Sequence, residues 1–276
     1  VRSRGLGDVY KRQVLGLAIL LSLFLLSATA PLLTPHDPER MKLSQALVAP
    51  SPQFPLGTDH LGRDMITRLL YGARLSLLIG FLAVAVGLVV GVPLGALSGY
   101  YGRWADLIIQ RIADVLLSFP GFLLALSLVA ILGIGLQNVI ISVGVSAIPS
   151  FIRLVRGSVL TIREQTYVEA ARAVGVRDGK IILRHVLPNA MAPVIVQATL
   201  NLGTAILVAA GLGFLGLGVQ PPTPEWGAML GEGRNYIFSA PYMATFPGLA
   251  IFFAVLGFNL LGDGLRDALD PRLRHV

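Results

Sequence analysis

The chain contains no cysteine, and this absence excludes several functions at once. A disulfide framework, a thiolate zinc site and thiol catalysis all need cysteine, so none of them is available here. Charged residues are also scarce: they make up 13% of the 276 residues, whereas soluble domains carry roughly 25%. A charged fraction this low is typical of a membrane protein.

The chain also lacks the patterns that hold nucleotides or metals. It has no G-x-x-x-x-G-K-[ST] stretch, and therefore no P-loop for ATP. Residues 211–216, GLGFLG, match G-x-G-x-x-G but lie inside an apolar run without a preceding soluble strand, which favours helix packing over a dinucleotide site. The four histidines, at positions 36, 60, 185 and 275, show no metal-ligand spacing. We expect no catalytic residue, no metal site and no cofactor.

The chain consists largely of long apolar runs. Hydrophobic residues make up 54% of the chain, and the mean hydropathy is +0.74. The net charge of +7 comes mainly from Lys and Arg between the apolar runs. That placement follows the positive-inside rule and does not indicate a surface for nucleic acid. The composition predicts a membrane protein with lipid around it and no nucleic-acid partner.

Six runs are long and apolar enough to cross a bilayer, which takes about 20 residues. The uncharged run over 115–152 is too long for one span and divides at residues 133–138. Pro120 and Pro149 are expected to kink the two resulting helices. We expect spans near residues 14–33, 75–99, 115–134, 139–159, 194–217 and 246–261. The predicted fold class is an all-α integral membrane protein with six transmembrane helices.

These spans divide the chain into four regions. Residues 1–13 fit poorly with the apolar run that follows and are either a non-native leader or a short basic tail. Residues 14–74 contain the first span and a polar arm, expected to be exposed to water and to have no core of its own. Residues 75–262 form a five-helix core that includes a loop at 153–188, and residues 263–276 form a tail.

Two smaller patterns predict packing and membrane contacts. Gly87, Gly91, Gly95 and Gly99 recur every four residues, so they form one helix face where a second helix can approach closely. Aromatic residues of the polar loop before the last span are expected to be anchors at the membrane interface. These residues are Trp226, Tyr236 and Tyr242.

Residues 169–188, EAARAVGVRDGKIILRHVLP, are the most informative stretch of the chain. They carry charges, while residues 115–152 before them and residues 186–224 carry none. Unpaired charges are costly in hydrocarbon, so this stretch must lie in water beside the bilayer.

The same stretch has the local signals of two short helices. Helix formers over 161–174 place Val168, Ala171 and Val174 near one face. Gly175 suits the left-handed position at a helix C-terminus, and Asp178 suits the N-cap of a second helix. The expected structure is a rigid knob made of two helices and a glycine turn.

The spacing in this stretch resembles the coupling loop of binding-protein-dependent ABC importer permeases. Glu-Ala-Ala is followed by three residues, Gly175, nine residues, and two more before Leu-Pro. His185 departs from the family pattern, which has a hydrophobic residue there. Five other stretches resemble the C-type subunit of the dipeptide, oligopeptide and nickel branch: LGTDHLGRD (56–64), YGARLSL (71–77), GYYGRWAD (99–106), FLGLGVQPPTPEWGAML (214–230) and FNLLGDGLRDALDPR (258–272).

The resemblance implies a type I permease fold in which a cytoplasmic coupling-helix loop docks on an ATPase. The residues implied for ATPase coupling are Glu169, Ala170, Ala171, Gly175, Leu187 and Pro188. It also implies a heterodimer with a second homologous permease, two cytoplasmic ABC ATPase subunits and an extracytoplasmic solute-binding protein. The implied location is the cytoplasmic (inner) membrane of a bacterium or archaeon.

Counting Lys and Arg gives the expected orientation. With loop 153–188 inside, the inner side carries twelve and the outer side six, leaving out residues 1–13. The excess places both termini in the cytoplasm.

Two other functions compete with an importer subunit. A self-sufficient secondary transporter or channel commonly places ionisable groups in mid-membrane, and the expected spans carry none in their centres. An intramembrane enzyme lacks any Ser-Lys, paired-Asp or H-E-x-x-H arrangement. The choice between a dipeptide, a longer peptide, nickel and another small solute stays open.

Overall fold

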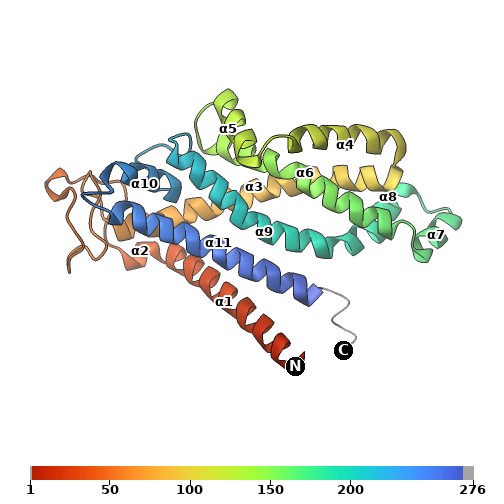
Figure 1. The fold of residues 1–276 in the computed structure, drawn as a ribbon, viewed down its shortest axis with the longest axis horizontal. Coiled ribbons are helices and arrows are strands. Elements are labelled where there is room, and N and C mark those ends of the chain that lie inside the picture. The colour runs from red at the N-terminus through yellow and green to blue at the C-terminus, as the bar shows by residue number, and fades with distance from the viewer. Residues whose placement is uncertain (1, 270–276) are drawn as a thin grey trace.

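A computed structural model describes residues 2–269, with side chains from residue 11 onward (Figure 1). Residues 270–276, which include most of the expected tail, lie outside the described residues. Within the described part the chain is helical and forms no strand, only an isolated bridge between Thr58 and Asp64. The all-α fold class is confirmed.

Five helices are long and apolar enough to cross a membrane, and a bent pair makes a sixth crossing. The five are α1 (Arg2–Ala28), α3 (Met65–Tyr101), α6 (Leu136–Ile162), α9 (Leu187–Phe214) and α11 (Tyr242–Leu269). The bent pair is α4 (Arg103–Leu117) and α5 (Gly121–Leu132). Shorter elements are α2 (Ala30–Leu33), α7 (Thr166–Ala173), α8 (Asp178–Ile181) and α10 (Trp226–Gly233).

The predicted third span is not one straight helix. The chain turns by 90° between α4 and α5, at Pro120. A proline has no N–H to donate and its ring clashes with the preceding turn, so it disfavours a continuing helix. The polar side of α4 faces the protein, since Asp106 and Asp114 pair with α6, and its apolar residues Trp104, Ile108 and Ile112 are exposed.

Two expected boundaries also differ. The helix expected from residue 75 begins at Met65, because the Asp64 side chain accepts the Thr67 N–H and caps α3 ten residues earlier. Residues 2–13 continue the helix of the first span, and Gln13 donates to the carbonyl of Gly264 in α11. Helix α1 runs antiparallel to α11, as the contacts of Gly16 with Leu260 and of Gly257 with Leu20 show.

The closest packing in the bundle lies between α3 and α6, which run in the same direction. Each glycine expected on one face of α3 lies against α6. A Cβ on Gly91 would lie 2.6 Å from the Cβ of Phe151, and one on Gly95 would lie 2.7 Å from the Ile152 carbonyl oxygen. Gly87 and Gly99 meet Ala147 and Val159 in the same register. The backbones approach to a distance that a side chain would prevent.

The two ends of the bundle differ, and we name them by their short helices. The α10 end carries α2, α10 and residues 34–64; the α7 end carries α7 and α8 at the opposite tip (Figure 1). Helix α3 extends between them.

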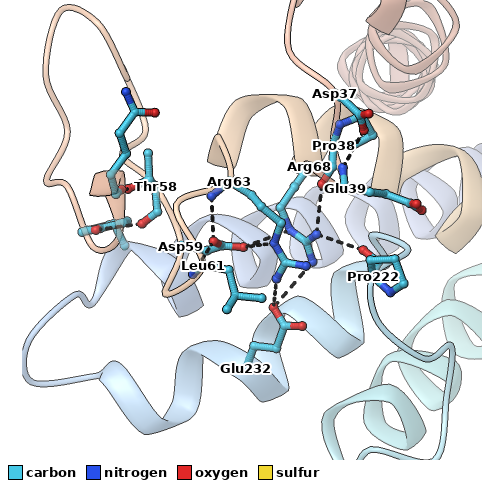
Figure 2. A network of polar contacts seen from close by, with 12 residues as sticks. Asp37, Pro38, Glu39, Thr58, Asp59, Leu61, Arg63, Arg68, Pro222 and Glu232 are labelled. Atoms are coloured by element: carbon cyan, nitrogen blue, oxygen red, sulfur yellow. Dashed lines mark hydrogen bonds and ion pairs between the residues drawn. The ribbon is translucent and has the colours of Figure 1, made fainter. Parts of the chain in front are cut away.

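At the α10 end, residues 34–64 are fastened by a buried ionic cluster (Figure 2). The side chains of Asp59, Arg63 and Arg68 are each 2% exposed or less, and each arginine forms ion pairs with Asp59 and with Glu232 of α10. Arg68 also donates to the carbonyls of Pro38 and Pro222. The arm is therefore packed against α3 and α10, although hydropathy alone predicted an exposed segment.

Three aromatic residues expected at the membrane interface hold this end together. Trp226 is buried, and its ring N–H donates to the carbonyl of Leu69. The Tyr242 hydroxyl lies 3.0 Å from the carbonyl oxygens of both Val48 and Thr58. Tyr236 stacks on His60, with ring centroids 5.5 Å apart. The prediction that Trp226 anchors the chain at the membrane interface was wrong, because its ring N–H has its hydrogen-bond partner inside the protein.

Beside Trp226, Glu225 caps α10. Its carboxylate accepts from the backbone N–H groups of Gly227 and Ala228 and from the Ser76 hydroxyl. Burial raises the pKa of the Glu225 carboxyl, and these hydrogen bonds to the charged form act in the opposite direction.

Candidate functional site

The candidate site is residues 163–186, here the α7–α8 segment, which joins α6 to α9 beyond the ends of the long helices (Figure 1). The single helix expected over 161–174 is interrupted, because α6 ends at Ile162 and α7 begins at Thr166. Arg163 lies in the break and donates to the carbonyls of Gly99 at 2.9 Å and Tyr100 at 3.4 Å. A cation at these carbonyls complements the negative end of α3.

An apolar underside holds the segment against the bundle. Val168 of α7, Ile181 of α8 and Val186 are fully buried, in one cluster with Tyr100 and with Val159 of α6. Each buried aliphatic side chain stabilises the packing by roughly 1.5–3 kcal/mol. The segment is therefore a packed knob that moves with the helices beneath it.

The turn between α7 and α8 depends on Gly175, as the sequence predicted. Its φ is +78°, in the left-handed region that side chains disfavour. The Gly175 N–H donates to Arg172 and the Val176 N–H to Ala171, which is the pairing of a Schellman motif. A Cβ at this position would meet nothing within 4 Å, so the requirement for glycine is conformational and not steric.

Asp178 does not cap α8 as expected. Arg177 takes the N-cap position without a side-chain cap, and Asp178 instead accepts a hydrogen bond from the Tyr100 hydroxyl at 2.7 Å. Arg172 of α7 lies over the same tyrosine, with Cζ 5.0 Å from the ring centroid. Its hydrogen bond to Tyr100 raises the pKa of Arg172 above the usual value. Sequence analysis assigned no role to Tyr100, although it lies in the GYYGRWAD stretch.

The outer face of α7 is open to solvent. Glu169 and Ala170 are exposed and Ala171 is half-buried. Among the described residues, the Glu169 side chain forms no hydrogen bond or ion pair. Val174, expected on the packed face, is 78% exposed, because the glycine turn carries it away from the bundle. The result is a small-residue surface with one free carboxylate at its edge.

The segment ends in a π-helical turn, η2 (Ile182–Val186), directly before Leu187 and Pro188. Pro188 has no N–H to donate to the preceding turn, and the Leu187 N–H reaches back five residues to the carbonyl of Ile182. Leu187 is half-buried in the cluster beneath α7, whereas Pro188 is exposed at the start of α9. His185 is half-buried, and its carbonyl accepts from the Asn189 side chain.

Two ion pairs join α4 to α6, the long helix that precedes the α7–α8 segment. Asp106 accepts two hydrogen bonds from Arg156, at 2.5 and 2.7 Å, and a third from Ser98 of α3. Asp114 pairs with Arg153 at 2.6 Å. Bidentate pairing of this kind fixes orientation as well as charge.

One group of described residues has the donor types for a metal: Asp59, His60 and Glu232 at the α10 end, with ligand atoms within 4.8 Å of one another. Both carboxylates already pair with Arg63 and Arg68. A metal ion there would face two guanidinium groups, so the chemistry of the cluster favours the ion pairs.

These features define a class: a polytopic, all-helical transport subunit that presents a short, rigid helix outside the membrane. The model of the family described as "Binding-protein-dependent transport system inner membrane component" matches residues 91–275, and the chain belongs to this family. It is a permease subunit of an ABC importer and not an enzyme. The secondary-transporter alternative finds no support in this result.

Curated relatives and a solved structure agree with this assignment. A dipeptide transport system permease protein DppC of Alkalihalophilus pseudofirmus is 52% identical over 264 residues, which cover 96% of this chain and 87% of the relative. A glutathione transport system permease protein GsiD of Pectobacterium atrosepticum is 50% identical over 260 residues, 94% of this chain and 86% of the relative. The MetNI methionine ABC transporter, in an inward-facing conformation, matches with a TM-score of 0.60 and 26% identity, over 75% of this chain and 98% of that chain.

Proposed function

We propose that this permease pairs with a second, homologous permease to enclose a path for a short peptide, and that α7 inserts into a groove on a cytoplasmic ATPase. Two ATPase subunits and an extracytoplasmic solute-binding protein complete the importer. The observation that carries the proposal is the outward-facing α7, packed on the bundle, with its small residues Ala170 and Ala171 and with Glu169 exposed beside them.

The geometry suits insertion into a groove. Small residues let another backbone approach closely, and Glu169, which has no hydrogen-bond or ion-pair partner among the residues that the structure describes, is available for a charge-assisted contact. The coupling residues fall into two groups: Glu169, Ala170 and Ala171 contact the ATPase, and Gly175, Leu187 and Pro188 hold the loop in shape.

A short peptide is the proposed solute class because two relatives near 50% identity are named for a dipeptide and for glutathione. Import of a dipeptide and of glutathione by the assembled transporter, each delivered by its binding protein, tests this class directly. Import of neither would reject it.

The proposed orientation places the α7 end and both termini in the cytoplasm of the cell, with the α10 end outside. The chain has no native cysteine, so single cysteines report without background. Lys180→Cys in α8 and Phe238→Cys, a fully exposed position at the α10 end, suit this test. In intact cells a membrane-impermeant maleimide should label only Phe238→Cys. Labelling of Lys180→Cys from outside would contradict the orientation.

Gly175→Val tests the docking role. A β-branched residue is strained at φ +78°, so the turn that aims α7 should distort while the membrane helices remain intact. We expect loss of most ATPase co-purification and of ATP-driven import. Gly179→Val is the matched control, because Gly179 lies in the same segment, has no positive φ and has open space around a Cβ. Normal ATPase binding by Gly175→Val would show that the segment is only a connector.

A further inference from the structure

One tyrosine joins both short helices of the α7–α8 segment to the longest helix of the molecule. Tyr100 is the penultimate residue of α3 and is 7% exposed. Its hydroxyl donates to Asp178 at 2.7 Å and accepts from Arg172 Nε at 3.4 Å. Arg172 belongs to α7 and Asp178 to the first turn of α8, so a single hydroxyl bridges the two sides of the Gly175 turn.

The ring and the hydroxyl of Tyr100 act in separable ways. The ring lies under the Arg172 guanidinium in cation–π geometry, 5.0 Å from centroid to Cζ, and this stack does not need the hydroxyl. The bond to Asp178 has a charged acceptor and a fixed direction, which makes it more oriented than the apolar contacts around it.

Tyr100 itself is firmly placed. Arg163 donates to the carbonyls of Gly99 and Tyr100, and Gly99 lies against the Arg156 carbonyl and Val159 of α6. The apolar contacts of Val168 and Ile181 hold the segment on the bundle, and because the hydrophobic effect is non-directional they do not by themselves set its angle. Arg163 orients the start of the segment on α3, and the Tyr100 hydroxyl is the oriented contact between α3 and the two short helices themselves.

We propose that Tyr100 is the positioning residue that transmits displacement of α7 and α8 to α3, so that movement of a docked ATPase tilts the transmembrane helices. The proposal rests on the proposed function, namely docking of an ATPase on α7. The Gly175 turn sets the shape of the segment, and Tyr100 sets its orientation relative to the bundle.

The test uses the complete importer in proteoliposomes, with Tyr100→Phe, Asp178→Ala and the double variant. Tyr101→Phe is the matched control: Tyr101 is the next residue, is exposed, and its hydroxyl forms no hydrogen bond with any residue that the structure describes. The readouts are solute imported per ATP hydrolysed, ATPase co-purified with the permease, and thermal unfolding of the complex.

Tyr100→Phe and Asp178→Ala should each lower solute imported per ATP by about three- to tenfold, the loss expected for one hydrogen bond. The double variant should fall no further than Tyr100→Phe, because that change already removes the bond to Asp178 together with the longer bond from Arg172. Co-purified ATPase should stay at the wild-type level, thermal unfolding should fall only by the amount expected for one lost hydrogen bond, and Tyr101→Phe should import normally.

Wild-type import per ATP in Tyr100→Phe would overturn the proposal, and so would additive losses in the double variant. Loss of co-purified ATPase in Tyr100→Phe would also overturn it, since Tyr100 would then serve docking and not transmission. Failure of the proposed function has a different signature: the unaltered permease would bind no ATPase or import nothing.

Discussion

The two ends of this permease hold their charges in opposite ways. At the α10 end, Arg63 and Arg68 are each 1% exposed and pair with acidic groups inside the protein. Toward the α7 end, the side chains of Arg156 and Asp106 remain 33% and 23% exposed. The two sets of ion pairs differ in their access to solvent.

This difference has an energetic meaning. Removing one partner of a buried pair leaves an uncompensated charge and typically costs about 3–5 kcal/mol, whereas an exposed pair contributes about 1 kcal/mol or less. The α10 end is thus a fixed block, in which the arm, α3 and α10 move together. The Asp106–Arg156 pair, toward the α7 end, can exchange its contacts with water at low cost.

The comparison is tested most strongly by Asp59→Ala. This change leaves Arg63 and Arg68 beside Glu232 alone, so we expect about 3–5 kcal/mol of destabilisation. The measurement is the free energy of unfolding in detergent micelles. Asp37→Ala, an exposed acid in the same arm whose carboxylate accepts the Glu39 N–H, should change it by about 1 kcal/mol or less. Equal losses of unfolding free energy from both variants would mean that the buried ionic cluster does not fix the arm to α3 and α10.

The next largest effect is expected between the ends, at the glycine face of α3. In Gly95→Leu the new side chain meets the Ile152 carbonyl oxygen and Val155, and overpacking of this kind costs about 1–3 kcal/mol. Unfolding of the purified permease measures it. Gly157→Leu in α6, where a Cβ would meet nothing within 4 Å, is the control and should be nearly neutral. Similar losses at both glycines would refute close packing as the reason for Gly95.

The smallest effect is expected from Asp106→Asn, which weakens the pair with Arg156 toward the α7 end. The partly exposed guanidinium keeps access to water, so the loss should be about 1 kcal/mol or less. A double-mutant cycle with Arg156→Gln isolates the pairwise energy. A loss as large as that of Asp59→Ala would remove the contrast between the two ends.

Local signals in the sequence predicted much of this molecule. A run of about 20 apolar residues announces a membrane helix by itself, and the left-handed Gly175 turn is set by its immediate neighbours. Pro120 marked the place where the third span breaks, although hydropathy carries no information about the direction of a bend.

Contacts between distant residues could not be predicted in this way. Tyr100 and Asp178 are 78 positions apart, and nothing near either residue indicates the other. Tryptophan is a residue type typical of membrane-interface anchors, yet the ring N–H of Trp226 donates to the Leu69 carbonyl inside the protein. Asp178 has the chemistry of an N-cap, and the tertiary hydrogen bond took precedence over the local one.

Because α3 is long, a small rotation at one of its ends corresponds to a much larger displacement at the other. Arg68 in the fixed cluster and Tyr100 beneath α7 lie 32 residues apart on one helix, which separates them by about 48 Å at about 1.5 Å per residue. Pro93 does not end this helix, and the glycines at 91 and 95 on either side of it hold it against α6. At this length, each degree of rotation of α3 about the cluster would move its far tip by about 0.8 Å. Hydrogen bonds weaken over a few tenths of an ångström, so the tip converts very small rotations into the making or breaking of a contact.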